Sequence, residues 1–88
     1  MANIRNLKKD INYVLGDIIE AVYSWEYLNL DKDTKKSEKI IDEAIKVFDD
    51  LILEVNKKDI SNKKEHFKSI GSKLEENGRL LIEKINKL

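Results

Sequence analysis

The chain of 88 residues contains no cysteine and no proline, and it has only one histidine. Without cysteine it can form no disulfide framework, no thiolate nucleophile and no zinc–thiolate site. Without proline, no helix is broken by the loss of a backbone N–H donor. A single histidine provides no second imidazole for a histidine-based metal site. We therefore expect no enzymatic activity, no catalytic residue, no metal and no cofactor.

Neither sign of charge is in excess, because lysine and arginine together number 17, as do aspartate and glutamate. A net charge of zero argues against non-specific binding to nucleic acid or to an anionic membrane. No apolar run approaches the ~20 residues of a membrane-spanning helix, and no apolar segment typical of a signal peptide follows the N-terminus. We expect a cytoplasmic protein without a membrane partner or a small-molecule substrate.

Apolar residues recur at intervals of three and four, which is the period of an amphipathic helix. This pattern predicts helices over about residues 3–28, 34–56 and 62–87. Leu15 and Val22 would lie on the flank of the first helix. The core-facing stripe of that helix would consist of Ile4, Leu7, Ile11, Val14, Ile18, Ala21, Trp25 and Leu28.

The segments between the predicted helices are short and polar, which favours antiparallel neighbours. The sequence therefore predicts an all-α, up-down-up antiparallel bundle of three long helices, forming one domain over residues 1–88. Asn62 and Glu65 resemble a capping box at the start of the third helix. Gly78 falls where the apolar stripe of that helix should continue. It either weakens the packing there or makes room for a close neighbour.

Residues 3–14 read NIRNLKKDINYV. This stretch resembles the opening of a family of short, all-helical bacterial proteins with no assigned activity. The resemblance implies a bacterial and cytoplasmic origin. It implies no activity, so no functional residues are carried over from the family.

The predicted first helix has a second set of residues on the side away from its core-facing stripe. Tyrosine and isoleucine supply interface area, and a glycine allows another helix to approach closely. In a three-helix bundle each helix faces two neighbours, so this set is either a wide internal core or a surface for another protein. A homodimer that pairs this helix with its copy would bury the tyrosines. The set consists of Asn12, Tyr13, Gly16, Ile19, Tyr23 and Tyr27.

A cluster of lysines surrounds the connection between the second and third predicted helices. Lysine near a helix N-terminus opposes the helix macrodipole, so the cluster could instead bind phosphate groups, nucleic acid or an acidic partner. It lacks arginine, and its only aromatic neighbour, Phe67, belongs to the core stripe. We favour local pairing with the acidic end of the second helix. The cluster consists of Lys57, Lys58, Lys63, Lys64 and Lys68.

The single histidine, His66, lies in the string EHFKSIGS, which resembles a histidine phosphotransfer motif. That motif has a lysine three residues after the histidine and a glycine directly after the lysine. Here Lys68 follows by two residues and Gly71 by five, so the lysine would lie on a different side of the helix. We interpret His66 as a boundary residue and keep phosphotransfer as a distant alternative.

Together these patterns predict a non-enzymatic helical module for protein–protein interaction, which could associate with itself through the outer face of the first helix. The alternative is a small protein that contacts anions or nucleic acid through the lysine cluster. The two hypotheses differ in salt dependence, because phosphate contacts weaken steeply as salt rises.

Overall fold

A computed structural model describes residues 4–88, and it contains three helices, α1 (Ile4–Leu28), α2 (Lys35–Val55) and α3 (Lys63–Asn86). No strand occurs between residues 4 and 88. The predicted all-α three-helix bundle is confirmed, and the helix ends lie within one residue of the expected ranges. Asn3, the expected first residue of the first helix, lies outside the described residues.

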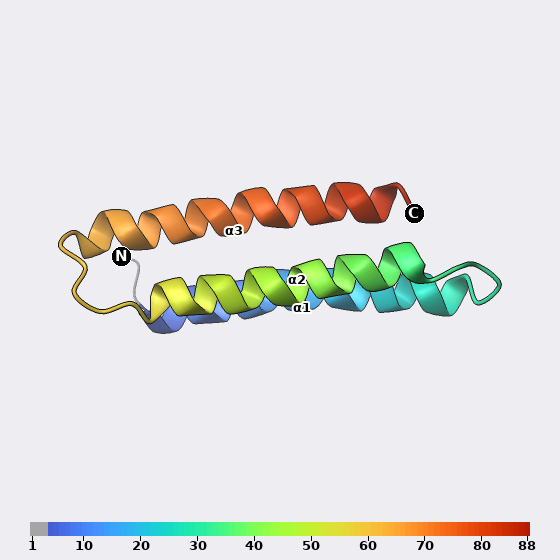
Figure 1. Cartoon of the computed structure of the whole chain (residues 1–88), viewed down its shortest axis with the longest axis horizontal. Helices are drawn as coiled ribbons and strands as arrows, with labels where there is room; N and C mark the ends of the chain where they lie inside the picture. The colour runs from blue at the N-terminus through green and yellow to red at the C-terminus, as the bar shows by residue number, and fades with distance from the viewer. Residues whose placement is uncertain (1–3) are drawn as a thin grey trace.

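The helices run up, down and up along a rod that measures 51 × 19 × 17 Å (Figure 1). Each helix packs against both of the others. Residues 29–34 connect α1 to α2 at one end of the rod, which also holds the end of α3. Residues 56–62 connect α2 to α3 at the other end, where α1 begins. We call these the 29–34 end and the 56–62 end.

The buried face of α1 is rotated from the expected stripe. Ile4, Ala21 and Leu28 are exposed, whereas Leu15 and Val22, expected on the flank, are buried. The 3-4 spacing includes every apolar residue that recurs at the helical period. The residues that become buried are those on the side of α1 that faces the other two helices. Val14 and Trp25 are half-buried. The residues that α1 buries are Leu7, Ile11, Leu15, Ile18 and Val22.

The other two helices complete the core. Ile45 lies four residues after the buried Ile41 of α2, at helical spacing, but it is 46% exposed. The buried apolar residues of α2 are Ile40, Ile41, Ala44, Leu51 and Val55. Those of α3 are Ile70, Leu74 and Leu81.

Gly78 is buried on α3 and faces α1. A Cβ atom added at Gly78 would lie 3.2 Å from Cγ1 of Val14, which is tighter than ordinary van der Waals contact. Of the two interpretations of Gly78, the structure supports the one in which the glycine makes room for a close neighbour. The missing side chain lets α3 approach α1 at this point.

Side-chain oxygens accept hydrogen bonds from backbone N–H groups at the starts of both later helices. The side-chain oxygen of Asn62 accepts a hydrogen bond from the backbone N–H of Glu65 at 3.2 Å, as the capping-box pattern predicts. At the start of α2, Asp33 Oδ1 accepts from the backbone N–H of Lys35 at 2.9 Å. The buried hydroxyl of Ser37 donates to the carboxylate of Glu26 at 2.5 Å, which ties the start of α2 to the end of α1.

Candidate functional site

The outer face of α1 consists of Asn12, Tyr13, Gly16, Ile19, Tyr23 and Tyr27. Its tyrosines lie largely outside the bundle, because Tyr13 is 58%, Tyr23 56% and Tyr27 75% exposed. Asn12 and Gly16 are also exposed. Ile19 differs, because it is half-buried and packs against the core. The interpretation as internal core therefore applies to Ile19 alone.

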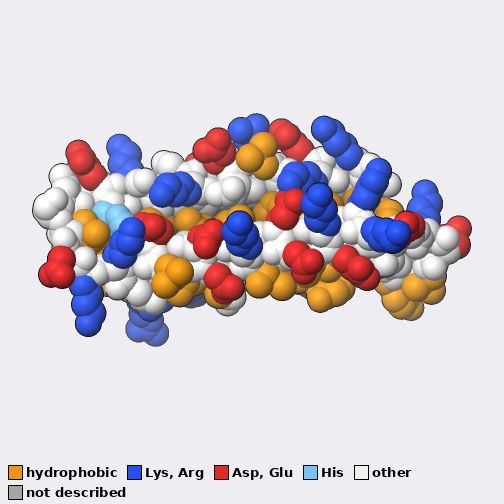
Figure 2. All heavy atoms as spheres, in the orientation of Figure 1, with side chains coloured by type: hydrophobic (Ala, Val, Ile, Leu, Met, Phe, Trp, Pro, Cys, Tyr) orange, Lys and Arg blue, Asp and Glu red, His pale blue; other side chains and the backbone are white. Residues whose placement is uncertain are grey.

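The surroundings of these residues divide the outer face of α1 in two. Tyr23 and Tyr27 line one shallow depression. Tyr13 lines a separate groove between α1 and α3, and the ammonium nitrogen of Lys9 lies 5.7 Å from its ring centroid. Between them, a Cβ atom added at Gly16 would meet nothing within 4 Å. Figure 2 shows hydrophobic side chains along the lower edge of the view, where α1 and α2 lie.

Charge is distributed unevenly along α1. Its basic residues precede its midpoint, and most of its acidic residues follow it. Because the two halves carry opposite charge, α1 is complementary to a reversed copy of itself. The basic residues are Arg5, Lys8 and Lys9, and the acidic residues are Asp10, Asp17, Glu20 and Glu26.

All five residues of the lysine cluster are exposed at the 56–62 end. The ammonium nitrogen of Lys57 lies 3.2 Å from Glu54 Oε1. The hydrogen bond from Lys57 holds the pKa of the Glu54 carboxyl below its usual value. The expected pairing with the acidic end of α2 occurs for this lysine alone, since the other four make no ion pair with residues 4–88.

The fold adds further positive charge to the 56–62 end. Arg5, Lys8 and Lys9 belong to the first turns of α1, which begins beside the connection between α2 and α3 (Figure 1). Figure 2 shows Lys and Arg side chains projecting from this end of the rod. Residues 57–68 and the start of α1 thus form one basic region, which sequence reasoning described only in part.

His66 is half-buried, and its Nε2 atom lies 2.6 Å from the backbone oxygen of Glu54. That carbonyl belongs to the last turn of α2, and it also accepts from the backbone N–H of Lys57 at 3.3 Å. The imidazole ring also packs at a tilt against the ring of Phe67, with centroids 5.7 Å apart. These contacts support the interpretation of His66 as a boundary residue that joins α3 to the end of α2.

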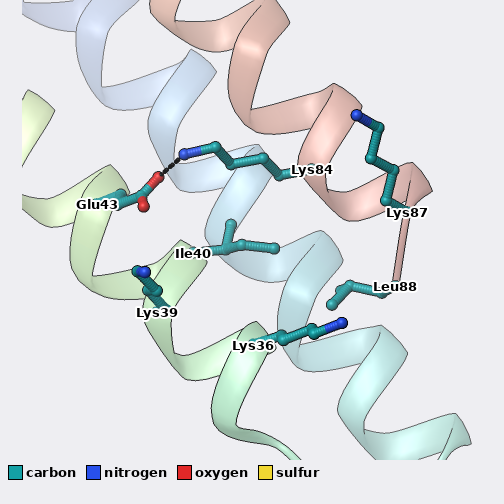
Figure 3. A pocket seen from close by; sticks show the side chains of 7 residues that line it. All are labelled: Lys36, Lys39, Ile40, Glu43, Lys84, Lys87 and Leu88. Carbon is teal, nitrogen blue, oxygen red and sulfur yellow. Dashed lines mark hydrogen bonds and ion pairs between the residues drawn. The ribbon is translucent and has the colours of Figure 1, made fainter.

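One group of residues was not singled out from the sequence. It surrounds a cavity of about 260 Å³ between the start of α2 and the end of α3 (Figure 3). The available signal was two lysine pairs with three-residue spacing, 36/39 and 84/87, which an antiparallel arrangement of α2 and α3 brings together. The cavity is lined by Lys36, Lys39, Ile40, Glu43, Lys84, Lys87 and Leu88.

Two further findings concern the described residues as a whole. Within residues 4–88, no three His, Asp or Glu side chains gather where a metal ion could be held. None of the three described helices is long and apolar enough to cross a membrane.

Comparisons with protein-family models, with curated proteins and with solved structures found no match to this chain. The resemblance of residues 3–14 to a bacterial family therefore stays a prediction.

Proposed function

We propose that this chain is a non-enzymatic interaction module that binds a second copy of itself through the outer face of α1. The observation that carries the proposal is the exposure of Tyr13, Tyr23 and Tyr27 on a helix face that the bundle leaves uncovered. Tyrosine is enriched at protein interfaces, because its ring buries a large area while its hydroxyl keeps a polar partner.

The charges of α1 favour an antiparallel pair. In that arrangement the basic first third of one α1 lies against the acidic second half of the other. A parallel pair would instead place like charges side by side. Because the whole chain has no net charge, no overall repulsion opposes the approach of two copies.

Gly16 lies midway between Ile4 and Leu28 and supports a crossing at that point. A two-fold axis beside Gly16 would bring the two glycines face to face, where neither has a Cβ atom to hold the helices apart. This register places Lys9 opposite Tyr23 of the second copy, and Arg5 opposite Tyr27. Cations stack on aromatic rings within about 6 Å, as Lys9 already does on Tyr13 in one chain.

Substitution Tyr23→Glu tests the proposal. Loss of the buried ring, together with the cost of desolvating a carboxylate, should raise the dissociation constant about thirtyfold or more, in line with a central interface residue. We expect light scattering over a range of concentrations to give twice the chain mass of 10.3 kDa for the wild type, and the single-chain mass for Tyr23→Glu. Circular dichroism should show unchanged helix content in both.

Leu53→Glu is the matched control, because Leu53 is 68% exposed and lies on α2. This variant should associate as the wild type does. The proposal is wrong if Tyr23→Glu associates normally, or if Leu53→Glu is equally weakened. Ile19 is unsuitable for this test, since it packs against the core and its substitution would disturb folding.

A second candidate function is contact with phosphate groups at the 56–62 end. The specific observation in its favour is that Arg5, Lys8 and Lys9 lie at the same end as the lysine cluster. Binding of a single-stranded RNA should then weaken steeply with salt. Changing Lys57, Lys58, Lys63 and Lys64 together to Gln should reduce both the affinity and the salt slope. Unchanged RNA binding by that variant would rule this candidate out.

A further inference from the structure

The cavity at the 29–34 end has a defined arrangement of side chains (Figure 3). Lys84 extends from α3 across the gap to α2, where its ammonium group pairs with the carboxylate of Glu43. Ile40 lies between the two helices, and Lys36 extends from α2 toward Leu88. Both helices therefore contribute charged side chains to the rim, and Ile40 of α2 and Leu88, which follows α3, form the apolar floor.

The rim carries positive charge that the chain does not neutralise. Glu43 offsets Lys84, but Lys36, Lys39 and Lys87 form no ion pair with the described residues. Lys84 and Lys87 suit the C-terminal end of α3, where the helix dipole favours cations. Lys36 and Lys39 lie near the start of α2, where the dipole disfavours them. Helix stability therefore does not explain why lysines occur at positions 36 and 39.

The floor of the cavity is apolar. Ile40 is 4% exposed and Leu88 is half-buried. The volume of about 260 Å³ lies just below the range of roughly 300–1,000 Å³ found for pockets of drug-sized ligands. The ligand that fits this lining is small, is anionic at one end and is apolar at the other.

We propose that this cavity binds a small amphipathic anion, which has a carboxylate or phosphate head on a short alkyl chain. The head pairs with Lys36, which extends toward Leu88, through charge-assisted hydrogen bonds, and Lys39 and Lys87 add positive potential around the rim. The alkyl chain covers Ile40 and Leu88 and removes their apolar surface from water. This site involves α2 and α3, so it is separate from the self-association proposed for the outer face of α1.

Trp25, the only tryptophan, provides an optical signal beside the site. It is half-buried and lines a small hollow together with Lys32, Asp33, Lys36 and Leu88. Lys36 and Leu88 also line the proposed site. An anion that orders these two side chains changes the surroundings of the indole ring.

The experiment is a titration of the full chain followed by Trp25 fluorescence. Octanoate and octyl phosphate should give saturable curves, and the tighter of the two identifies the preferred head. Octanol, which lacks the charge, and inorganic phosphate, which lacks the chain, should bind at least about tenfold more weakly. The proposal is overturned if octanol or inorganic phosphate binds as tightly as the amphipathic anions, or if neither anion saturates.

Paired substitutions locate the binding. Lys36→Gln with Lys87→Gln should weaken octanoate about tenfold or more, because both changes remove charge from the rim. Lys63→Gln with Lys64→Gln is the matched control, since it removes the same charge at the 56–62 end and should leave the midpoint unchanged. Equal weakening by both pairs, or by neither, would contradict the proposed site. All four lysines are exposed, so both variants should fold.

Discussion

At the scale of single residues, Gly16 and Gly78 show how one residue type serves two different positions. Gly78 is buried, and its missing side chain makes room for Val14 of α1. Gly16 lies on the exposed side of α1 with open space around it. A glycine inside a helix lowers stability by about 1 kcal/mol relative to alanine. Contact with a neighbouring helix explains that loss at Gly78, but nothing within the chain explains it at Gly16.

Alanine substitutions should separate the two glycines. Gly16→Ala should raise the free energy of unfolding by about 1 kcal/mol, because the helix gains propensity and the new Cβ meets no atom. Gly78→Ala should be less stable than Gly16→Ala by about 1–3 kcal/mol, since Val14 must move. Urea denaturation measures both, at protein concentrations low enough to keep the chain monomeric.

Gly71→Ala is the control for this comparison. A Cβ atom at Gly71 would also meet nothing within 4 Å, so this variant should be stabilised like Gly16→Ala. Equal stabilisation of all three variants would show that the close approach of α1 and α3 at Gly78 has no energetic consequence.

At the scale of helices, local chemistry allowed the ends to be predicted. Helix ends depend on caps and on polar connections, and Asn62 with Glu65 is one such local signal. The face that a helix buries depends on where its neighbours lie. The periodicity of one segment gives no information on their positions. Leu15 and Val22 were therefore placed on the flank of α1, although Leu15 is 1% and Val22 0% exposed.

The candidate sites also depend on how the helices pack. The tyrosines of α1 were recognised as a distinct set, but their exposure became evident only once α2 and α3 were placed. Lys36 and Lys87 are distant in the sequence, and they line one cavity because α2 and α3 are antiparallel. A site that combines the start of one helix with the end of another requires the packing before it can be identified.

At the scale of the whole molecule, zero net charge conceals a polarised rod. Residues 4–10 and 54–68, at the 56–62 end, hold eight basic and four acidic residues. The remaining length therefore carries the balancing excess of acidic residues. A parallel pair would place the two basic ends side by side, whereas a reversed second copy keeps them apart, so this distribution supports antiparallel self-association over a parallel arrangement.

The central claim is that two copies pair antiparallel through the outer face of α1, with the crossing at Gly16. This register places residue 12 of one copy opposite residue 20 of the other. Two copies of residue 12 would instead be eight residues apart along the pair, or about 12 Å. Asn12 and Glu20 are both exposed, and the chain has no cysteine of its own.

The most direct measurement is cross-linking of Asn12→Cys and Glu20→Cys chains by a short bismaleimide. We expect a mixture of the two variants to give covalent dimers that join residue 12 to residue 20, identified by mass spectrometry of the peptides. Each variant alone should give far fewer dimers. Equal yields for the mixture and for each variant alone, or no covalent dimer from any of them, would contradict the proposed pairing.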